Sequence, residues 1–136
     1  MIAALFAAGL LAAAEPVLTP EQLAEVILTA GACAGAGWQA ADDATGNAFV
    51  EAVALQHPGM TSEQFGQAVM AAVPAARERI FGGAVADRAG YLLWADDFAR
   101  RCDALAAAHP RILQRGPETA ARWADERAQG AANRSN

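Results

Sequence analysis

Two cysteines limit what this chain can fold into, because each lies on the apolar face of a predicted helix. Cys102 belongs to the stretch 91–105 (YLLWADDFARRCDAL), where large apolar side chains recur at intervals of three and four residues. Cys33 lies in a second amphipathic segment, whose apolar face is made of small residues. An even number of cysteines in an exported protein normally forms disulfides. The sequence therefore predicts a bond between Cys33 and Cys102, with a bulky helix face packed against a small one.

The predicted bond would close a loop of about 70 residues and stabilise the fold by roughly 4 kcal/mol. A redox-active pair would need the close Cys-x-x-Cys spacing, which this chain lacks. Acylation of Cys33 as a lipoprotein does not fit, because Glu21 and Glu25 interrupt the segment before it and Ala30 replaces the usual larger aliphatic residue. We therefore interpret the pair as a structural disulfide.

The composition predicts an all-α fold. Alanine, the best helix former, is heavily used, and no β-branched or aromatic run indicates a strand. A chain of 136 residues is long enough for one domain and too short for two. We expect a single bundle of about five helices joined by short connections, with sequence neighbours packed roughly antiparallel.

Local signals place these helices. The expected spans are 20–43, 47–56, 62–81, 85–108 and a final segment after residues 116–118. The glycines within 31–37 either allow close packing or mark a break in the first helix before Trp38, and we favour the longer helix, with a possible bend near Gly37.

Thr19 and Thr61 each begin a capping box, with glutamine three residues later. Pro74 either kinks the third helix or begins a new one. The helical domain is expected over residues 15–128, followed by a disordered tail at 129–136.

Residues 1–14 (MIAALFAAGLLAAA) are predicted to be a cleaved export signal. They are apolar throughout, shorter than the roughly 20 residues that span a bilayer, and end in small residues that suit a signal peptidase. The basic residue usual near the start of a signal is missing. An uncleaved anchor and a misassigned start codon are the alternatives. We expect a periplasmic or secreted protein with no stable membrane span after processing.

The charge distribution is uneven. The formal net charge is −5, which argues against a nucleic-acid partner. Residues 1–73 contain neither lysine nor arginine, whereas residues 74–136 contain all ten basic residues, every one an arginine. Such asymmetry indicates either an interaction surface or acidic helices packed beside arginine-bearing ones.

No motif predicts catalysis, so no catalytic residue, metal site or cofactor is expected. His57 and His109 each precede a proline at a helix end, where they would cap the last carbonyl groups or complement the helix dipole. Two acidic pairs, Asp42-Asp43 and Asp96-Asp97, could suggest acid–base chemistry, but neighbours on a helix point about 100° apart. Asp96 and Asp97 stand four residues before Arg100 and Arg101, the usual spacing of surface ion pairs. The aromatic side chains are interpreted as core.

The hypothesis for function is a non-enzymatic exported protein that binds or stabilises another macromolecule, a protein or envelope partner, through residues that the sequence does not identify. One alternative is a hydrolase of envelope material with a site built from acids and arginines. Another is a homo-oligomer assembled through the small face at Gly31 and Gly35. The oligomeric state stays open. No family resemblance decides among these hypotheses.

Overall fold

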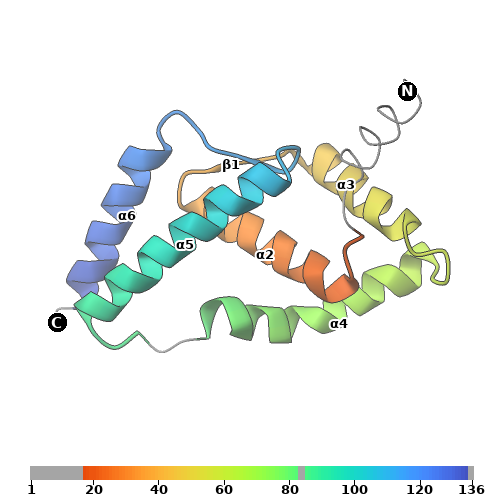
Figure 1. Ribbon diagram of the computed structural model, residues 1–136, viewed down its shortest axis with the longest axis horizontal. Coiled ribbons are helices and arrows are strands. Elements are labelled where there is room, and N and C mark those ends of the chain that lie inside the picture. Colours follow the sequence, from red (N-terminus) through yellow and green to blue (C-terminus); the bar gives the residue numbers. More distant parts are fainter. Residues whose placement is uncertain (1–16, 83–84, 135–136) are drawn as a thin grey trace, which may run out of the picture.

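The computed structural model describes residues 17–82 and 85–134 (Figure 1). These residues form five helices and two very short strands: α2 (Pro20–Gly35), β1 (Gln39–Ala40), α3 (Asp43–Leu55), α4 (Ser62–Phe81), α5 (Arg88–Ala108), β2 (Leu113–Gln114) and α6 (Thr119–Asn133). The predicted all-α class is confirmed. The predicted signal at 1–14 lies outside the described residues, and its export role stays a prediction. Among the described helices, none combines the length and the apolar character needed to cross a bilayer.

Both predicted capping boxes start helices. The Thr19 hydroxyl accepts a hydrogen bond from the Gln22 amide at 3.1 Å, and the Gln22 side chain accepts one from the Thr19 amide at 3.0 Å. Thr61 and Gln64 repeat this arrangement at the start of α4. Each box satisfies two amides that have no partner within the helix.

The start of α3 differs from the prediction. Asp42, not a residue near Asn47, caps this helix, and its carboxylate accepts a hydrogen bond from the Thr45 amide at 2.7 Å. That bond to the backbone, followed by the side-chain contact with Thr45, lowers the pKa of Asp42 below its ordinary value. Asp42 is therefore the N-cap of α3 and not, as predicted, a residue inside the first helix.

The prediction that the first helix runs to about Asp43 is wrong, because α2 ends at Gly35. Gly37 adopts a φ of 113°, in the left-handed region that favours glycine. A Cβ atom there would also lie 3.2 Å from the Cβ of Arg122. The chain then extends into β1, which pairs antiparallel with β2. This small ladder ties the α2–α3 connection to the α5–α6 connection.

The other helices follow the pattern more closely. α4 runs without interruption through Pro74. α5 ends at Ala108 as predicted, but it begins at Arg88 and not at residue 85, because the Asp87 side chain caps its first turn.

The predicted disordered tail is wrong for residues 129–133, which continue α6. There Ala131 is only 3% exposed and Gly130 lies directly against Tyr91, so packing holds the last turns in place. Residues 135–136 lie outside the described part of the chain.

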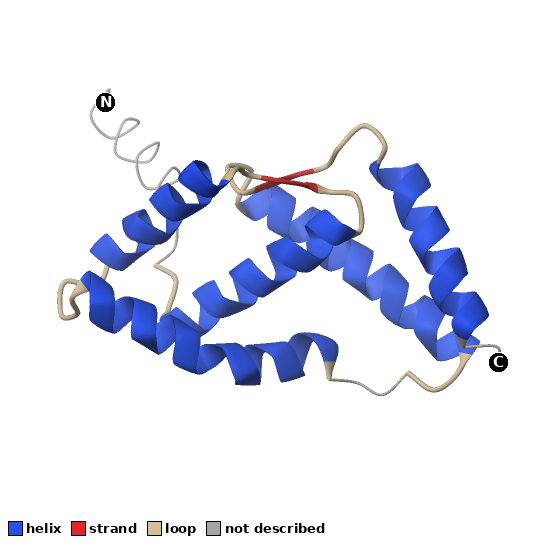
Figure 2. Cartoon of the chain, turned by 180° about the vertical axis from the view of Figure 1, so that it is seen from behind, coloured by secondary structure: helices blue, strands red, loops and turns tan. Residues whose placement is uncertain are grey.

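The helices surround α2, which packs most extensively along α4 and is crossed by α5. α6 packs on α5 at one end of the molecule, and α3 lies at the other end (Figures 1 and 2). Two main apolar clusters result. One joins α2, α3 and α4 around Leu23, Phe49 and Phe65. The other joins α2 and α5 around Phe98 and the cysteines.

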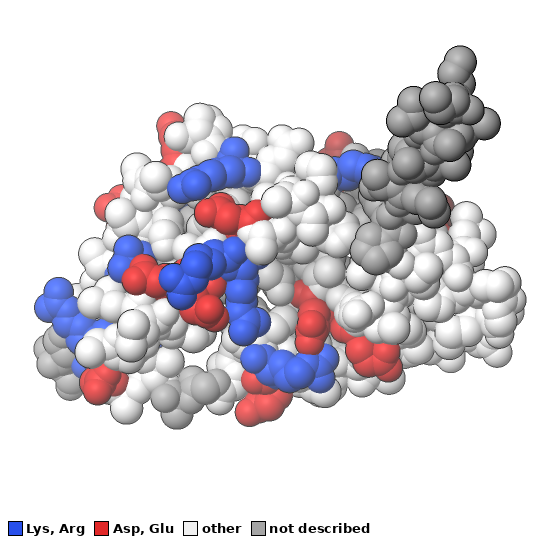
Figure 3. Space-filling view, viewed as in Figure 1, with Lys and Arg blue, Asp and Glu red and all other residues white. Residues whose placement is uncertain are grey.

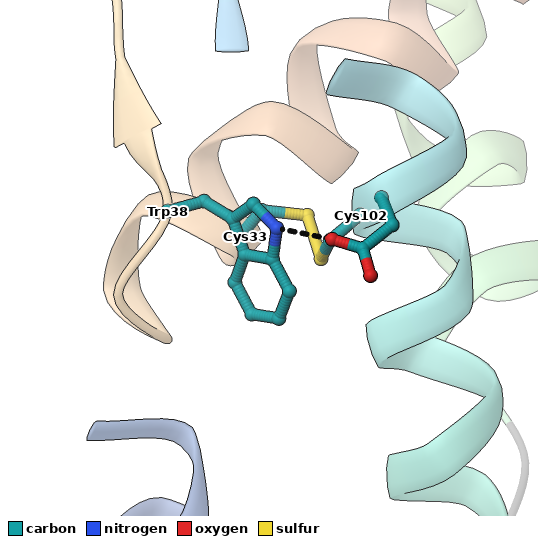
Figure 4. The surroundings of a disulfide bond; sticks show 4 residues. Cys33, Trp38 and Cys102 are labelled. Atoms are coloured by element: carbon teal, nitrogen blue, oxygen red, sulfur yellow. Dashed lines mark hydrogen bonds between the residues drawn. A yellow bond between two sulfur atoms is a disulfide. The ribbon is translucent and has the colours of Figure 1, made fainter. Parts of the chain in front are cut away.

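The predicted disulfide joins Cys33 of α2 to Cys102 of α5, across a sequence separation of 69 and a Cα–Cα distance of 5.7 Å. Both cysteines are fully buried. Beside the bond, the Trp38 indole donates a hydrogen bond to Asp103 at 3.0 Å (Figure 4). The disulfide and this hydrogen bond both hold the C-terminal end of α2 against α5.

The small face of α2 is only partly covered. Cys33 and Ala36 pack in the same cluster as Phe98 and Leu105 of α5, so bulky and small residues do meet. Gly31 and Gly35 lie elsewhere on α2, and a Cβ atom placed on either would have no heavy atom within 4 Å. Within the described chain, these glycines therefore leave open space and do not serve close helix packing.

Candidate functional site

One end of the molecule contains a hollow of about 250 Å³ between α2, α5, α6 and the last residue of α4. We call it the aromatic groove. Five aromatic side chains line it: Phe81, Tyr91, Trp94, Phe98 and Trp123. The opposite wall is made of small residues near the end of α2, Ala32, Gly35 and Ala36. Glu126 of α6 is the one charged residue among those that line the groove.

The aromatic rings form a continuous series from α5 to α6. Trp94 stacks on Phe98 with centroids 5.4 Å apart and an interplanar angle of 14°. Phe98 contacts Trp123 at 5.2 Å, and Tyr91 contacts Trp94 at 5.7 Å. These separations fall in the range where ring pairs attract each other beyond simple area burial. The series therefore fixes the orientation of the groove's wall.

The same rings are not a closed core. Phe98 is buried, but Trp94 and Trp123 are half-buried, and Phe81 keeps 37% of its surface exposed. The interpretation of all aromatic residues as core is therefore wrong for Phe81, whereas Trp94 and Trp123 pack against the buried clusters and also line the groove. The missed signal was Trp123, a single large apolar residue on a helix that is otherwise polar or small.

α6 is anchored at both of its ends, and two of the residues that line the groove lie between these anchors. At its start, the buried Thr119 hydroxyl lies 3.0 Å from the carbonyl oxygen of Gly37 and 2.8 Å from that of Gly116. At its other end, the Arg134 guanidinium lies over the Tyr91 ring, 4.9 Å from the centroid. Between these anchors Trp123 and Glu126 face the hollow.

The middle of α6 is also tied to α5 by an ion pair. Asp96 of α5 bonds Arg127 of α6 at 3.0 Å, so its predicted pairing with Arg100 is wrong. α6 brings a closer arginine to that carboxylate. The predicted pair of Asp97 with Arg101 is confirmed at 3.1 Å. Figure 3 shows the arginine and acidic side chains interleaved over α5 and its surroundings.

In the part of the chain that the structure describes, few ion pairs connect the acidic half (residues 1–73) to the half that contains the arginines (residues 74–136). Among the described residues, one ion pair joins the acidic half to the arginine-bearing half, from Glu25 of α2 to Arg79 of α4 at 2.6 Å. The remaining pairs lie within residues 74–136. Packing of acidic helices beside arginine-bearing ones therefore explains only part of the asymmetry.

Both histidines lie at helix ends as predicted, but their side chains make other contacts than expected. The His57 Nε2 atom lies 2.7 Å from the Leu18 carbonyl oxygen, and its ring contacts Phe65. His109 ends α5 through its backbone amide, while its side chain is 7% exposed and packs edge-on against Phe49. Neither side chain caps the helix that it follows. Each instead joins its helix end to another part of the fold.

His109 also borders a second hollow, of about 380 Å³, between α2 and α5. Its Nδ1 atom is buried and has no hydrogen-bond partner in the described structure. Glu25 and Arg101 line the same hollow. The Glu25 carboxylate is already bonded to Arg79. Neither in this hollow nor in any other part of residues 17–82 and 85–134 is a cluster of three or more histidine, cysteine or acidic side chains placed to hold a metal ion.

The fold and the groove together define a small helical bundle, linked by one disulfide, with an aromatic surface hollow at one end. Comparison with protein families, with curated proteins and with solved structures finds no match to this chain.

Proposed function

We propose that this chain is a non-enzymatic binding protein that acts outside the cytoplasm and holds another macromolecule at the aromatic groove. The observation that carries the proposal is the gathering of five aromatic side chains around one open hollow. Tryptophan and tyrosine dominate the energetics of protein interfaces, because they bury a large area with few rotatable bonds.

The partial exposure of the groove's rings supports the same proposal. Tryptophans that are only partly buried leave some apolar surface in contact with water, which a partner could cover. Trp94 and Trp123 are such residues, and the stacking on Phe98 holds Trp94 in a fixed orientation. A partner would therefore meet a pre-oriented surface and would lose little conformational freedom from this side.

Two features support a location outside the cytoplasm. The buried Cys33–Cys102 disulfide is typical of oxidising compartments such as the periplasm or the exterior. The apolar segment 1–14 has the length and the small-residue end of an export signal.

A photo-crosslinker at the groove tests the proposal. In the native host, Phe81 is replaced by benzoylphenylalanine, which keeps an aromatic ring at the rim of the groove. The matched control carries the crosslinker at Leu93, which is 74% exposed and does not line the groove. We expect a reproducible crosslinked partner from position 81 and none from position 93. Mass spectrometry of the product then identifies the partner.

A blocking substitution shows whether the groove itself is occupied. Gly35 lines the groove and a Cβ atom placed there meets nothing within 4 Å, so Gly35→Leu should extend a side chain into the hollow and obstruct it. Gly31→Leu adds the same side chain one helical turn earlier, outside the groove. We expect Gly35→Leu to abolish the crosslink and Gly31→Leu to preserve it. No product at position 81, or an equal product in both glycine variants, would contradict the proposed function.

A further inference from the structure

We infer that the aromatic groove accepts an arginine side chain presented by its partner. This inference rests on the proposed function and adds the chemistry of the group that is bound. It follows from three properties of the groove: the charge of its lining, the guanidinium already stacked on one of its rings, and its size.

The charge of the groove is complementary to a cation. Glu126 is its one charged lining residue, and no ion pair of Glu126 is found in the described chain. The nearby acid Asp96 is by contrast bonded to Arg127. A carboxylate without a partner beside aromatic rings makes a region of negative potential, since the faces of the rings are themselves negative.

The chain already binds one guanidinium on the same set of rings. The Arg134 side chain lies over Tyr91, 4.9 Å from the ring centroid, and its Nε atom donates a hydrogen bond to the Val85 carbonyl oxygen at 3.0 Å. A planar guanidinium can thus stack on a ring and direct its N–H groups to an oxygen acceptor at the edge. In the groove, Trp94 or Trp123 would supply the ring and Glu126 the acceptor.

The size of the groove favours one side chain. Its volume of about 250 Å³ is below the roughly 300 to 1,000 Å³ typical of small-molecule pockets. Arginine suits this space better than lysine or a quaternary ammonium group. Its flat head can stack on an indole and also form two parallel hydrogen bonds with one carboxylate. A rounded ammonium group cannot do both.

A titration of the full chain tests the inference. The probe is N-acetylarginine amide, and the readout is the shift of the tryptophan indole N–H signals in nuclear magnetic resonance spectra. N-acetylcitrulline amide has nearly the same shape without the charge, N-acetyllysine amide keeps the charge without the planar head, and choline provides a quaternary ammonium group. We expect saturable shifts with the arginine probe and at least fivefold weaker binding of the other three.

Substitution of the carboxylate provides the second measurement. Glu126→Gln keeps the shape of the side chain and should weaken binding of the arginine probe about fivefold, the effect of one exposed ion pair. Asp125→Asn is the matched control, because Asp125 is its exposed neighbour and does not line the groove. This variant should bind as the unmodified chain does.

Several outcomes would overturn the inference. These are the absence of saturable shifts with the arginine probe, equal binding of citrulline, lysine or choline, or unchanged binding by Glu126→Gln. The crosslink from position 81 separates this failure from failure of the proposed function. If Gly35→Leu abolishes that crosslink while Glu126→Gln leaves it intact, the groove binds the partner through a group other than arginine.

Discussion

The two ends of the molecule use their aromatic residues differently. At the end formed by α2, α3 and α4, Phe49 and Phe65 are 3% and 1% exposed and are enclosed by apolar side chains from three helices. At the other end, Trp94 and Trp123 are half-buried on the wall of a hollow. The first arrangement is a core, and the second is a surface that can receive a ligand.

The difference arises from how the outer helices are attached. α2 lies along α4 over much of its length, so facing side chains exclude water from both. α6 contacts α5 mainly, and its buried residues, Thr119 and Ala131, lie near its two ends. In a chain rich in alanine, large side chains are too few to fill both spaces. A hollow then remains between α6 and the small residues at the end of α2.

The largest expected effect distinguishes the two ends directly. Phe65→Ala should lower the free energy of unfolding by roughly 3 to 5 kcal/mol, because it empties a closed core. Trp94→Ala should lower it by only about 1 to 2 kcal/mol, because a partly buried ring loses less buried area. Urea denaturation measures both values. Equal losses would show that the aromatic groove belongs to the core after all.

The disulfide joins α2 to α5 between these two ends. Replacement of Cys33 and Cys102 by alanine should lower the free energy of unfolding by roughly 2 to 4 kcal/mol, since the unfolded chain regains the freedom of a long loop. Hydrogen exchange should rise more at α5 and α6 than at α4, because α4 keeps its long contact with α2. Uniform loss of protection along the chain would contradict this division.

Sequence reasoning succeeded where the determining contacts are local. Thr19 and Thr61 cap their helices by hydrogen bonds with a glutamine three positions later, so the local sequence pattern was sufficient to predict both starts. The cysteine pairing was also accessible, because only two cysteines were present to pair. Part of the candidate site was also predictable from the sequence, since the spacing within 91–105 placed Tyr91, Trp94 and Phe98 on one helix face and all three line the groove.

Sequence reasoning failed where distant segments decide the outcome. α2 ends where Gly37 adopts a positive φ, and the glycines before Trp38 gave a local hint of this break. The pairing of the following residues with β2 is a long-range contact that no local pattern indicates. Asp96 pairs with Arg127 from another helix instead of with an arginine on its own. The exposure of Trp94 depends on how α6 crosses the groove, and periodicity within α5 cannot show this. Whether a residue on a helix face is buried depends on which other element packs against that face.

A matched pair of glycine substitutions sharpens the contrast between filled and open space. Gly130→Ala should destabilise the fold by about 1 to 3 kcal/mol, because the added methyl group would collide with the buried Tyr91 ring. Gly35→Ala should stabilise it by roughly 0.5 to 1 kcal/mol, because alanine favours the helix and nothing lies near the new atom. Thermal or urea unfolding measures both. A destabilised Gly35→Ala variant would show that the wall of the groove is closed.

The smallest effect concerns pH and the end of the molecule that holds α3. The pKa of Asp42 is lowered in the folded chain, chiefly by the hydrogen bond from the Thr45 amide, so its ionised form stabilises the fold. That contribution is present above the ordinary pKa of 3.8 and is lost as the pH falls through the lower folded value. Asp42→Asn keeps a capping side chain but removes the charge. The variant should therefore be less stable than the unmodified chain at neutral pH, and the difference should vanish in acid. Urea unfolding across pH 2 to 7 measures it, and a difference that persists unchanged at the acid end would show that the cap acts through shape and not through charge.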